Sequence, residues 1–430
     1  MKLEGRVAAA IDERRASDLA RDLYGFEATA RALPGEYDDN FHLVAPDGSQ
    51  RVLKVMHPAR ERSLIDLQCA ALEHVASRAP HLELPRVCRT REGATIAVAD
   101  DGDAWRLVWM LTWVPGRPLA QARPHNADLL AGVGRLLGEM DRALLDFSHP
   151  EAERPDLKWD LSHAGWIRDA IPLVADARRR LWVELALARF EAEAVPALPR
   201  LRRSVIHGDA NDYNVIAGDP RRQPRPASVI DLGDMHRGLT VAEPAIAAAY
   251  VLLGKPDLLA AAADLVRGYH AACPLDETEI ALLHTLVAAR LAVSVTNAAL
   301  MKTRRPDDPY VTINEAPAWD ALERWLAIHP RLAHYRFREA CGRPPLPHGP
   351  RVAAWIGAQD AAPMLAGIDL RDAPSLVLDL GVSSRLLGAD PAAAETGALT
   401  RTIFGAMERT GVGVAVGRYD EARLLYSSDL

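Results

Sequence analysis

Three polar side chains within residues 204–234 have the types and the spacing that metal-assisted phosphoryl transfer requires. Asp209 follows an apolar pair and a His-Gly turn, Asn214 comes five residues later, and the apolar run 227–230 leads to Asp231. This transfer needs a carboxylate that takes the proton of an acceptor hydroxyl, and oxygen ligands for a divalent cation on the nucleotide phosphates. We therefore predict Asp209 as the base and Asn214 and Asp231 as ligands of Mg²⁺, a hard cation that prefers oxygen.

The same stretch is predicted to fold as strand, turn and strand, with an acid after each strand. Gly208 permits the sharp bend before Asp209, and a polar segment rich in Pro and Arg connects the two strands. Asp, Asn and Gly are individually common in turns because they form local hydrogen bonds there. Their combination with two apolar strands favours a catalytic site over an ordinary loop.

The elements that must face this loop lie nearer the N-terminus. Residues 36–58 contain two strand-like runs around the turn Asp47–Gly48, which predicts a β-hairpin. Lys54 lies on the second run between Leu53 and Val55. In kinases a lysine on such a strand reaches the nucleotide phosphates. We predict this role for Lys54, and the alternative is an ordinary lysine that extends from an apolar strand.

Gly35, Asp39 and Asn40 border the first strand of the hairpin, where a loop would cover the phosphates. This segment is not Gly-rich, so Gly35 alone would supply its flexibility. We predict that these three residues contribute to the nucleotide site.

The next segment, residues 63–76, is predicted to be a helix. A kinase carries here a Glu that forms an ion pair with the strand lysine. The register of the segment places Gln68 at this position, and an amide can still hydrogen-bond the lysine without the charge assistance of an ion pair. Glu61 and Glu73 are the alternative partners of Lys54.

The pattern of apolar residues divides the chain into a strand-rich part and a helical part. Residues 16–33 have helical spacing, which predicts a helix capped by Ser17 or Asp18. Strands follow as far as residue 114. The later segments with apolar stripes at three- and four-residue spacing are 127–147, 167–192, 242–253, 256–271, 277–300 and 316–328.

The motif H-G-D-x-x-x-x-N followed by I-D-x-G-D resembles the paired catalytic motifs of protein kinases. It is more similar to those of the aminoglycoside phosphotransferase and choline kinase group of small-molecule kinases. Further fragments are similar to those of hydroxylysine kinases and extend the resemblance over roughly residues 18–332: LYG near Leu23, LPGEYDDNFHL from Leu33, RLVWMLTWVPG from Arg106, WDL from Trp159 and ARLAVSVTNA from Ala289. That subgroup also resembles this chain in having Gln at the position of Gln68.

The resemblance implies an α+β, protein-kinase-like fold with a small antiparallel-sheet N-lobe over residues 1–115 and a larger helical C-lobe over residues 116–340. It implies ATP or GTP as the phosphoryl donor, Mg²⁺ as the cofactor, and a hydroxyl of a small amino alcohol or hydroxylated amino acid as the acceptor. The apolar strand that ends at residue 114 would be the hinge whose backbone binds the nucleotide base. Leu111, Trp113 and Val114 are therefore the base-contacting candidates.

The acceptor is expected to bind in the helical lobe near Asp209. Asp234 and His236 are candidates for binding an ammonium or hydroxyl group. Arg290 and Asn297 lie seven residues apart on one helix face and are candidates for a carboxylate. The alternative for Arg290 is an ion pair with a buried acid such as Glu243, and for Trp159 a place in the core or the cleft wall.

Residues 341–430 lie outside the kinase plan. The Pro-rich run 342–350 predicts a linker, and the patterns after it, including a helix near residues 391–408, predict a small α/β unit. Hydroxylysine-kinase-like domains also occur at the front of longer polypeptides with a peptidase-like region and a pyridoxal-phosphate enzyme. By this resemblance we expect the chain to be the N-terminal portion of such a protein.

Composition excludes several other classes of protein. The net charge of −7 provides no basic field for nucleic acid. The four cysteines are far apart, which argues against a zinc site or a disulfide framework and favours the cytoplasm. The apolar window 280–301 contains His284, Arg290 and Asn297, so we expect a core helix and no association with a membrane. The short apolar run near the N-terminus is interrupted by acids and is not a secretory signal.

Two other functions compete with a kinase of amino alcohols or hydroxylated amino acids. An antibiotic phosphotransferase of the aminoglycoside or macrolide type would have the same catalytic motif, but it usually needs an acidic cleft for its polycationic or bulky acceptor, and no acidic cluster stands out in the helical lobe. A pseudokinase would bind nucleotide and position a partner domain. Gln68 and the poor phosphate loop favour a pseudokinase, whereas the complete set of base and ligands argues against it.

Overall fold

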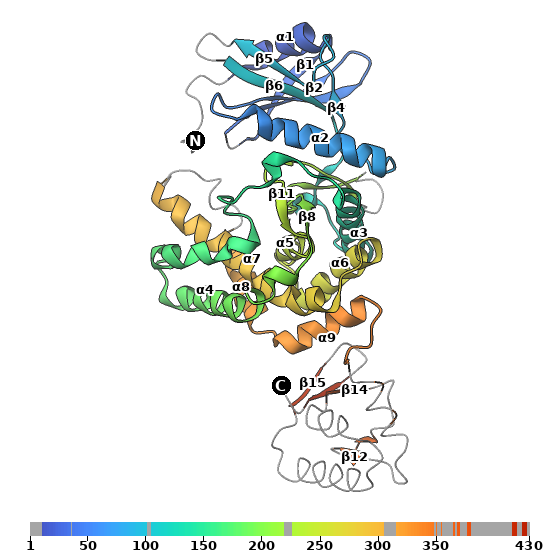
Figure 1. The fold of residues 1–430 in the computed structure, drawn as a ribbon, viewed down its shortest axis with the longest axis vertical. Coiled ribbons are helices and arrows are strands. Elements are labelled where there is room, and N and C mark those ends of the chain that lie inside the picture. The colour runs from blue at the N-terminus through green and yellow to red at the C-terminus, as the bar shows by residue number, and fades with distance from the viewer. Residues whose placement is uncertain are drawn as a thin grey trace.

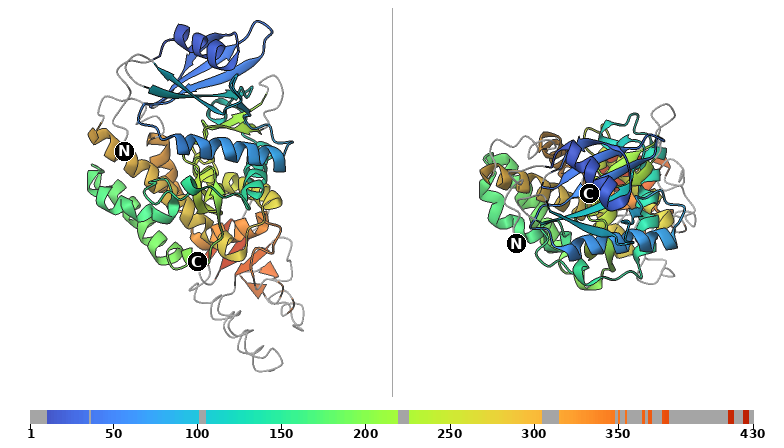
Figure 2. Two further views of the ribbon diagram at one scale, coloured as in Figure 1. Left: turned by 45° about the horizontal axis from the view of Figure 1, so that its top comes forward. Right: turned by 90° about the horizontal axis from the view of Figure 1, so that it is seen from above.

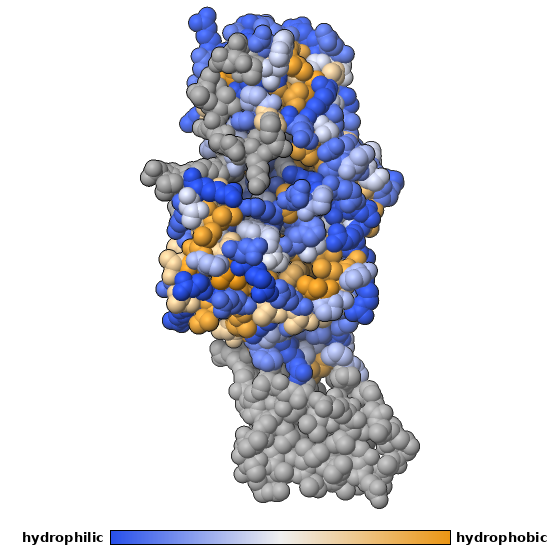
Figure 3. All heavy atoms as spheres, turned by 60° about the vertical axis from the view of Figure 1, so that its left-hand side comes forward, coloured by the Kyte–Doolittle hydropathy of each residue, from blue (hydrophilic) through white to orange (hydrophobic). Residues whose placement is uncertain are grey.

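The protein consists of a strand-rich lobe above a helical lobe (Figure 1). The computed structural model describes residues 11–35, 37–100, 105–218, 226–304 and 315–347, and beyond them isolated positions and short strands. The antiparallel sheet of the first lobe and the helices of the second confirm the predicted α+β, protein-kinase-like fold class. On the face shown in Figure 3, polar side chains predominate over the first lobe, while apolar patches are scattered over the second.

The N-lobe is a six-stranded antiparallel sheet in the order β1-β2-β3-β6-β4, with β5 paired to β6. The predicted hairpin forms its centre, and Lys54 on β3 lies between Asn40 on β2 and Trp109 on β6. The strands are β1 (Thr29–Leu33), β2 (Asp39–Val44), β3 (Gln50–Val55), β4 (Val87–Cys88), β5 (Ile96–Asp100) and β6 (Trp105–Thr112).

The helices α1 (Glu13–Tyr24) and α2 (Arg62–Arg78) belong to different cores. Buried side chains of α1 pack with the sheet strands in a small core of the N-lobe. Those of α2, among them Ile65 and Leu72, share one continuous core with the helices of the C-lobe. Figure 2 shows α2 between the sheet and the helical lobe, so burial of its apolar face joins the two lobes.

The predicted helix over residues 16–33 was wrong at both ends. Asp12 caps α1 by accepting a hydrogen bond from the backbone of Arg15, so the helix begins before the predicted caps. It ends at Gly25, whose φ of +67° is the left-handed conformation typical of a helix C-cap. Residues 29–33 then form β1, which pairs with β2. Backbone pairing with β2 overrides the helical spacing of the apolar residues.

The C-lobe contains most of the predicted helices. The predicted helix 167–192 is divided, because Pro172 lies in a 3₁₀ segment, Leu161–Leu173, that precedes α4. The α-helices of this lobe are α3 (Ala127–Leu144), α4 (Ala177–Arg189), α5 (Ala242–Val251), α6 (Leu258–Ala272), α7 (Glu277–Arg304), α8 (Glu315–Leu326) and α9 (Pro330–Ala340). By length and composition alone α7 could span a membrane, but 83% of its most apolar window is buried inside the protein, as in a core helix.

Glycines allow α3 and α6 to pack closely. A Cβ added at Gly268 of α6 would lie 1.7 Å from the carbonyl oxygen of Ala131 on α3, and a Cβ added at Gly134 would lie 1.9 Å from that of Leu265. Both clashes are with backbone atoms, which cannot move without separating the helices. The two glycines therefore set the distance between α3 and α6, on which the shape of the lobe depends.

We expect Gly268→Ala to lower the free energy of unfolding by about 2 kcal/mol or more, because overpacking the crossing outweighs the better helix propensity of Ala. Urea denaturation measures this change. Gly165→Ala is the matched control, because a Cβ there meets nothing within 4 Å and the change should stay within about 0.5 kcal/mol. Equal stability of the two variants would contradict the prediction.

Short strands follow the helical lobe. β14 (Leu376–Asp379) is parallel to β16 (Leu424–Ser427), and β15 (Ala415–Arg418) is antiparallel to β16. The helix predicted near residues 391–408 lies outside the described residues, as does the rest of that unit apart from its strands.

Candidate active site

Two pairs of short strands position the predicted catalytic residues. β8 (Arg203–Ile206) pairs with β11 (His236–Leu239), and β9 (Val215–Ala217) pairs with β10 (Pro226–Val229). Asp209 lies in the turn after β8, Asn214 directly precedes β9, and Asp231 follows β10. The backbone N–H of Ile230 donates to the carbonyl of Asn214 at 2.9 Å, which ties the two segments together. Asp209, Asn214 and Asp231 thus lie close together in the C-lobe.

The turn before Asp209 requires glycine. Gly208 has φ +77°, and an added Cβ would lie 2.7 Å from the ring of His236 and 2.9 Å from the carbonyl oxygen of Asp234. Its backbone N–H donates to a carboxylate oxygen of Glu243 at 2.9 Å. Glu243 is fully buried on α5, so a helix of the core fixes the turn that carries Asp209.

Three side chains hold the carboxylate of Asp209. Its Oδ2 accepts hydrogen bonds from the amide groups of Asn211, at 2.8 Å, and Asn214, at 3.0 Å. Its Oδ1 accepts one from Arg290 Nη2 at 2.7 Å. Because a carboxylate oxygen has two lone pairs, Oδ1 keeps one for a further donor such as a hydroxyl. This is the geometry that a general base needs.

Lys54 and Asp231 connect the two lobes at this site. Lys54 Nζ lies 3.6 Å from Asp231 Oδ1 and 5.5 Å from the centre of the Trp109 ring. Asp231 has φ +64° and is the non-glycine residue with positive φ in the described part of the chain. Such a strained conformation occurs most often at functional sites. Here it follows the end of β10 and brings the carboxylate toward the lysine.

The electrostatics of the cluster fit a bound cation. The nearby charge of Lys54 lowers the pKa of Asp231, so its carboxylate is ionised at neutral pH. Burial raises the pKa of Asp209 against the opposing effect of Arg290, and it also raises the pKa of Asp234. The negative charge of Asp231 contributes to both increases in pKa. A divalent cation here would relieve the repulsion among these acids.

The donors present suit a magnesium-nucleotide complex. The amide nitrogen of Asn214 donates to Asp209, and its oxygen accepts no hydrogen bond from a described residue, which leaves it for a cation. Within the described ranges, no group of three or more His, Cys, Asp or Glu side chains forms a metal cluster. Magnesium does not need one, since it binds through one or two protein oxygens plus phosphates and water. Asp231 and Asn214 would hold it.

The residues predicted for the phosphate loop have mainly structural contacts. Asp39 is buried and forms an ion pair with Arg106 at 2.9 Å inside the N-lobe. Asn40 donates to the carbonyls of Pro34 and Asp38. At Gly35 an added Cβ would lie 2.4 Å from the Asp38 carbonyl oxygen, so glycine is required for this close turn. Asp39 is thus held by Arg106 within the N-lobe, and its role in the nucleotide site stays a prediction.

Lys54 does not pair with a residue of α2. The amide nitrogen of Gln68 donates to the carbonyl of Leu64 one turn earlier, at 3.2 Å. Of the two alternatives, Glu73 forms an ion pair with Arg89, and Glu61 is an exposed residue at the start of α2. In this arrangement the charge partner of Lys54 is Asp231, on the other lobe.

The hinge candidates lie at the end of β6. Leu111 is buried and pairs with Val52 and Val87 of the neighbouring strands. Trp113 donates its backbone N–H to Gln50 at 3.3 Å, and its ring stacks on His42 with 3.9 Å between the centres. Val114 follows, half-buried. Leu111 and Trp113 therefore support the strand end, and the segment joins the lobes where a hinge is expected.

Arg290 does form an ion pair with an acid, which was its alternative role, but the acid is Asp209 and not the suggested Glu243. Glu243 accepts its hydrogen bond from Gly208, whereas Arg290 pairs with Asp209 at 2.7 Å. The ring of Trp159 lies over the guanidinium, with 4.5 Å from its carbon to the ring centre. The acid that pairs with Arg290 is thus Asp209, the predicted base, because α7 passes behind the turn that carries it.

The other acceptor candidates differ in position. Asp234 is half-buried beside Asp231 and Arg154. His236 is only 2% exposed, and its ring contacts the carbonyl of Asp234 and, at 3.7 Å, the carboxylate of Asp160. It supports the loop from inside. Asn297 is half-buried on α7, two turns beyond Arg290.

Three further residues around the site were missed in the sequence. Asn211 holds Asp209 and accepts from the backbone of residues 213 and 214, and its position two residues after Asp209 is a signal for such an Asx turn. Arg154 donates to the carbonyls of Gly233 and Met235 and so fixes the loop after Asp231. The hydroxyl of Tyr250 accepts a hydrogen bond from Arg290 Nη2 at 3.1 Å. Nothing in the local sequence marks these last two.

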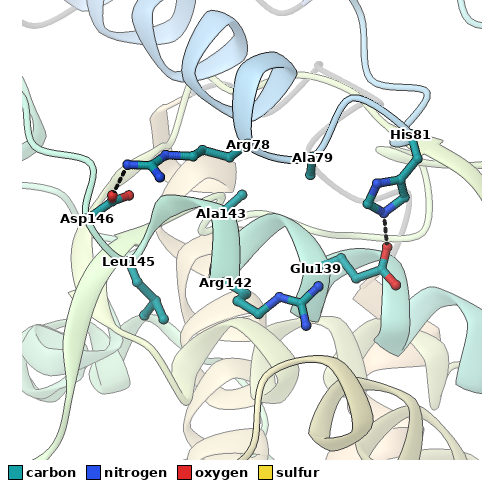
Figure 4. Close-up of a pocket in the computed structure, with 8 residues that line it drawn as sticks. All are labelled: Arg78, Ala79, His81, Glu139, Arg142, Ala143, Leu145 and Asp146. Atoms are coloured by element: carbon teal, nitrogen blue, oxygen red, sulfur yellow. Dashed lines mark hydrogen bonds and ion pairs between the residues drawn. The ribbon is translucent and has the colours of Figure 1, made fainter.

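A separate hollow lies between α2 and α3, away from these residues (Figure 4). Ion pairs join its sides, Arg78 to Asp146 and His81 to Glu139. None of the residues predicted for the site lines it. Ion pairs near the surface, such as these, contribute little to stability.

We expect Lys54→Met to raise the KM for nucleotide by roughly ten- to a hundredfold, because a charge-assisted contact to the phosphates is lost. Initial-rate kinetics at varied nucleotide concentration measure this effect. Arg51→Met, on the same strand, is the control and should leave the KM within about threefold. An unchanged KM in the Lys54 variant would exclude it from the nucleotide site.

A model described as the phosphotransferase enzyme family matches residues 29–283. Hydroxylysine kinase of Mus musculus is 28% identical over 337 residues, which cover 73% of this chain and 88% of that protein. Hydroxylysine kinase of Danio rerio is 25% identical over 324 residues, which cover 73% and 91%.

Solved structures share the fold. An amicoumacin kinase in complex with AMP-PNP, Ca²⁺ and its antibiotic has a TM-score of 0.55 at 15% identity and covers 73% of this chain and 94% of its own. A microcompartment-associated aminopropanol kinase has a TM-score of 0.51 at 16% identity and covers 77% and 99%.

Proposed function

We infer the reaction from the family: this chain belongs to the phosphotransferase enzyme family and is a small-molecule kinase. We propose that it transfers the γ-phosphoryl group of ATP or GTP to a hydroxyl of a hydroxylated amino acid or amino alcohol. Similarity to hydroxylysine kinases along most of their length supports this acceptor class.

One observation carries the proposal: Asp209 Oδ1 is held by Arg290 yet keeps a free lone pair, beside a lysine-carboxylate pair that spans the lobes. Asp209 would take the proton of the acceptor hydroxyl as its oxygen attacks the γ-phosphorus. Asn211 and Asn214 fix the carboxylate plane for that step. Lys54 would hold the donor phosphates from the N-lobe.

Asn214 and Asp231 would hold Mg²⁺. A divalent cation bound there would neutralise the negative charge that develops on the phosphates. Asp234, next to Asp231, is the proposed partner of an ammonium group on the acceptor. Arg154 keeps the loop of both acids in place through the carbonyls of Gly233 and Met235. A pyridoxal-phosphate domain downstream is still a prediction from the resemblance.

The test is a screen of hydroxylated amino acids and amino alcohols with ATP and with GTP in the presence of Mg²⁺. The release of the nucleoside diphosphate, ADP or GDP, is measured. We expect acceptor-dependent release with at least one compound, at a rate well above nucleotide hydrolysis in buffer. Aminoglycosides and macrolides belong in the same screen. Turnover of these antibiotics alone would contradict the proposed acceptor class, and nucleotide binding without transfer would indicate a pseudokinase.

A further inference from the structure

Arg290 has more hydrogen-bonding capacity than the protein uses. Its guanidinium is fully buried, and only Nη2 has partners, Asp209 Oδ1 at 2.7 Å and the Tyr250 hydroxyl at 3.1 Å. Its Nε and Nη1 atoms are buried with no hydrogen-bond partner among the described residues. A buried charged group with unused donors costs stability. Such a cost is typical of a group that binds a ligand.

Its surroundings leave the guanidinium ready for an anion. Trp159 and Tyr250 lie against it, with 4.5 and 5.4 Å from its carbon to the ring centres, so apolar faces restrict its motion. Asp209 does not depend on Arg290 alone, because Asn211 and Asn214 hold its other oxygen. The arginine is therefore more than a support for the base.

We propose that Arg290 determines acceptor specificity by binding a carboxylate of the acceptor while it contacts Asp209. This inference rests on the proposed function and narrows it: the acceptor is a hydroxylated amino acid, and amino alcohols without a carboxylate are poor substrates. A carboxylate oxygen of the acceptor accepts a charge-assisted hydrogen bond from one of the two unused donors, on Nη1 or Nε.

The distances suit such a molecule. The hydroxyl must lie within about 3 Å of Asp209, whose Oδ1 is itself 2.7 Å from Arg290 Nη2. A hydroxyl at Asp209 and a carboxylate at Arg290 can therefore belong to one small hydroxylated amino acid, and the chain length between the two groups decides which amino acid fits. An ammonium group on the same molecule faces the acidic side of the site, toward Asp234.

The experiment compares pairs of acceptors that differ only by the carboxylate: hydroxylysine with its decarboxylated diamino alcohol, and L-threonine with 1-aminopropan-2-ol. In the pair that the natural chain phosphorylates faster, we expect kcat/KM to be about a hundredfold higher for the amino acid than for the amino alcohol. In Arg290→Gln the preference falls to near one, while Arg290→Lys keeps part of it. Arg267→Gln, an exposed arginine of α6 paired with Asp264, is the matched control and keeps the full preference.

The ratio separates specificity from support of the base. If Arg290 only positions Asp209, its replacement slows both members of a pair equally and the ratio is unchanged, which would overturn the inference. The natural chain alone also tests the inference, so the test remains valid if Arg290→Gln does not fold. If the natural chain phosphorylates the amino alcohols as fast as the corresponding amino acids, the inference is wrong, whereas the proposed function is unaffected. No transfer to any hydroxylated amino acid or amino alcohol of the wider screen, with nucleotide bound, would instead overturn the proposed function and this inference with it.

Discussion

Asp209→Asn should lower kcat about a thousandfold, because the amide cannot take the proton of the acceptor hydroxyl. The side chain keeps nearly the same shape, so Asn211 and Asn214 still surround it, and the fold is expected to survive. The KM for nucleotide should change little, since Asp209 would not contact the donor. Steady-state kinetics with a thermal melt of the same sample measure both effects.

The control for this variant is Asp264→Asn, a half-buried acid of α6 paired with Arg267. It removes one carboxylate without approaching the site, so its kcat should be that of the natural chain. An Asp209→Asn enzyme that is folded and retains more than about a tenth of the activity would exclude Asp209 as the base.

Asp231→Asn should reduce kcat/KM about a hundredfold or more and raise the Mg²⁺ concentration needed for half-maximal rate. The variant loses the anionic oxygen that would hold the cation and the charge that faces Lys54 at 3.6 Å. Titration of the rate with Mg²⁺ at fixed nucleotide measures the change. Added Mg²⁺ should recover part of the lost rate, which distinguishes weak metal binding from loss of the base.

The matched control is Asp320→Asn, an exposed acid of α8 in an ion pair with Arg324. Its Mg²⁺ dependence should equal that of the natural chain. An Asp231→Asn enzyme with an unshifted Mg²⁺ requirement would assign the metal to other residues.

The catalytic stretch was predictable because its geometry is local. Apolar runs before Asp209 and Asp231 become β8 and β10, and Gly208 adopts the left-handed turn that its type permits. The approach of Lys54 to Asp231 follows from the place of β3 in the N-lobe sheet and from the kinase-like fold that the motif around Asp209 and Asp231 implies. The α+β class and the succession of sheet and helices follow from the same periodicities.

Contacts between distant elements could not be predicted in this way. The pairing of Arg290 with Asp209 joins residues 81 positions apart, and its register depends on how α7 packs in the core. The ion pair of Asp39 with Arg106 on β6 also joins residues far apart in the sequence, and nothing in the loop sequence indicates it. The helix expected over residues 16–33 failed for a related reason: strand pairing with β2 is a tertiary effect that spacing alone does not report.

The central claim is phosphoryl transfer to a hydroxyl oxygen, and ³¹P NMR of the product tests it most directly. With hydroxylysine, nucleoside triphosphate and Mg²⁺, the account predicts a new phosphomonoester signal coupled to the proton of the hydroxyl-bearing carbon, absent with Asp209→Asn. Inorganic phosphate as the sole new signal with every acceptor tested, or a phosphorus bound to nitrogen, would contradict it.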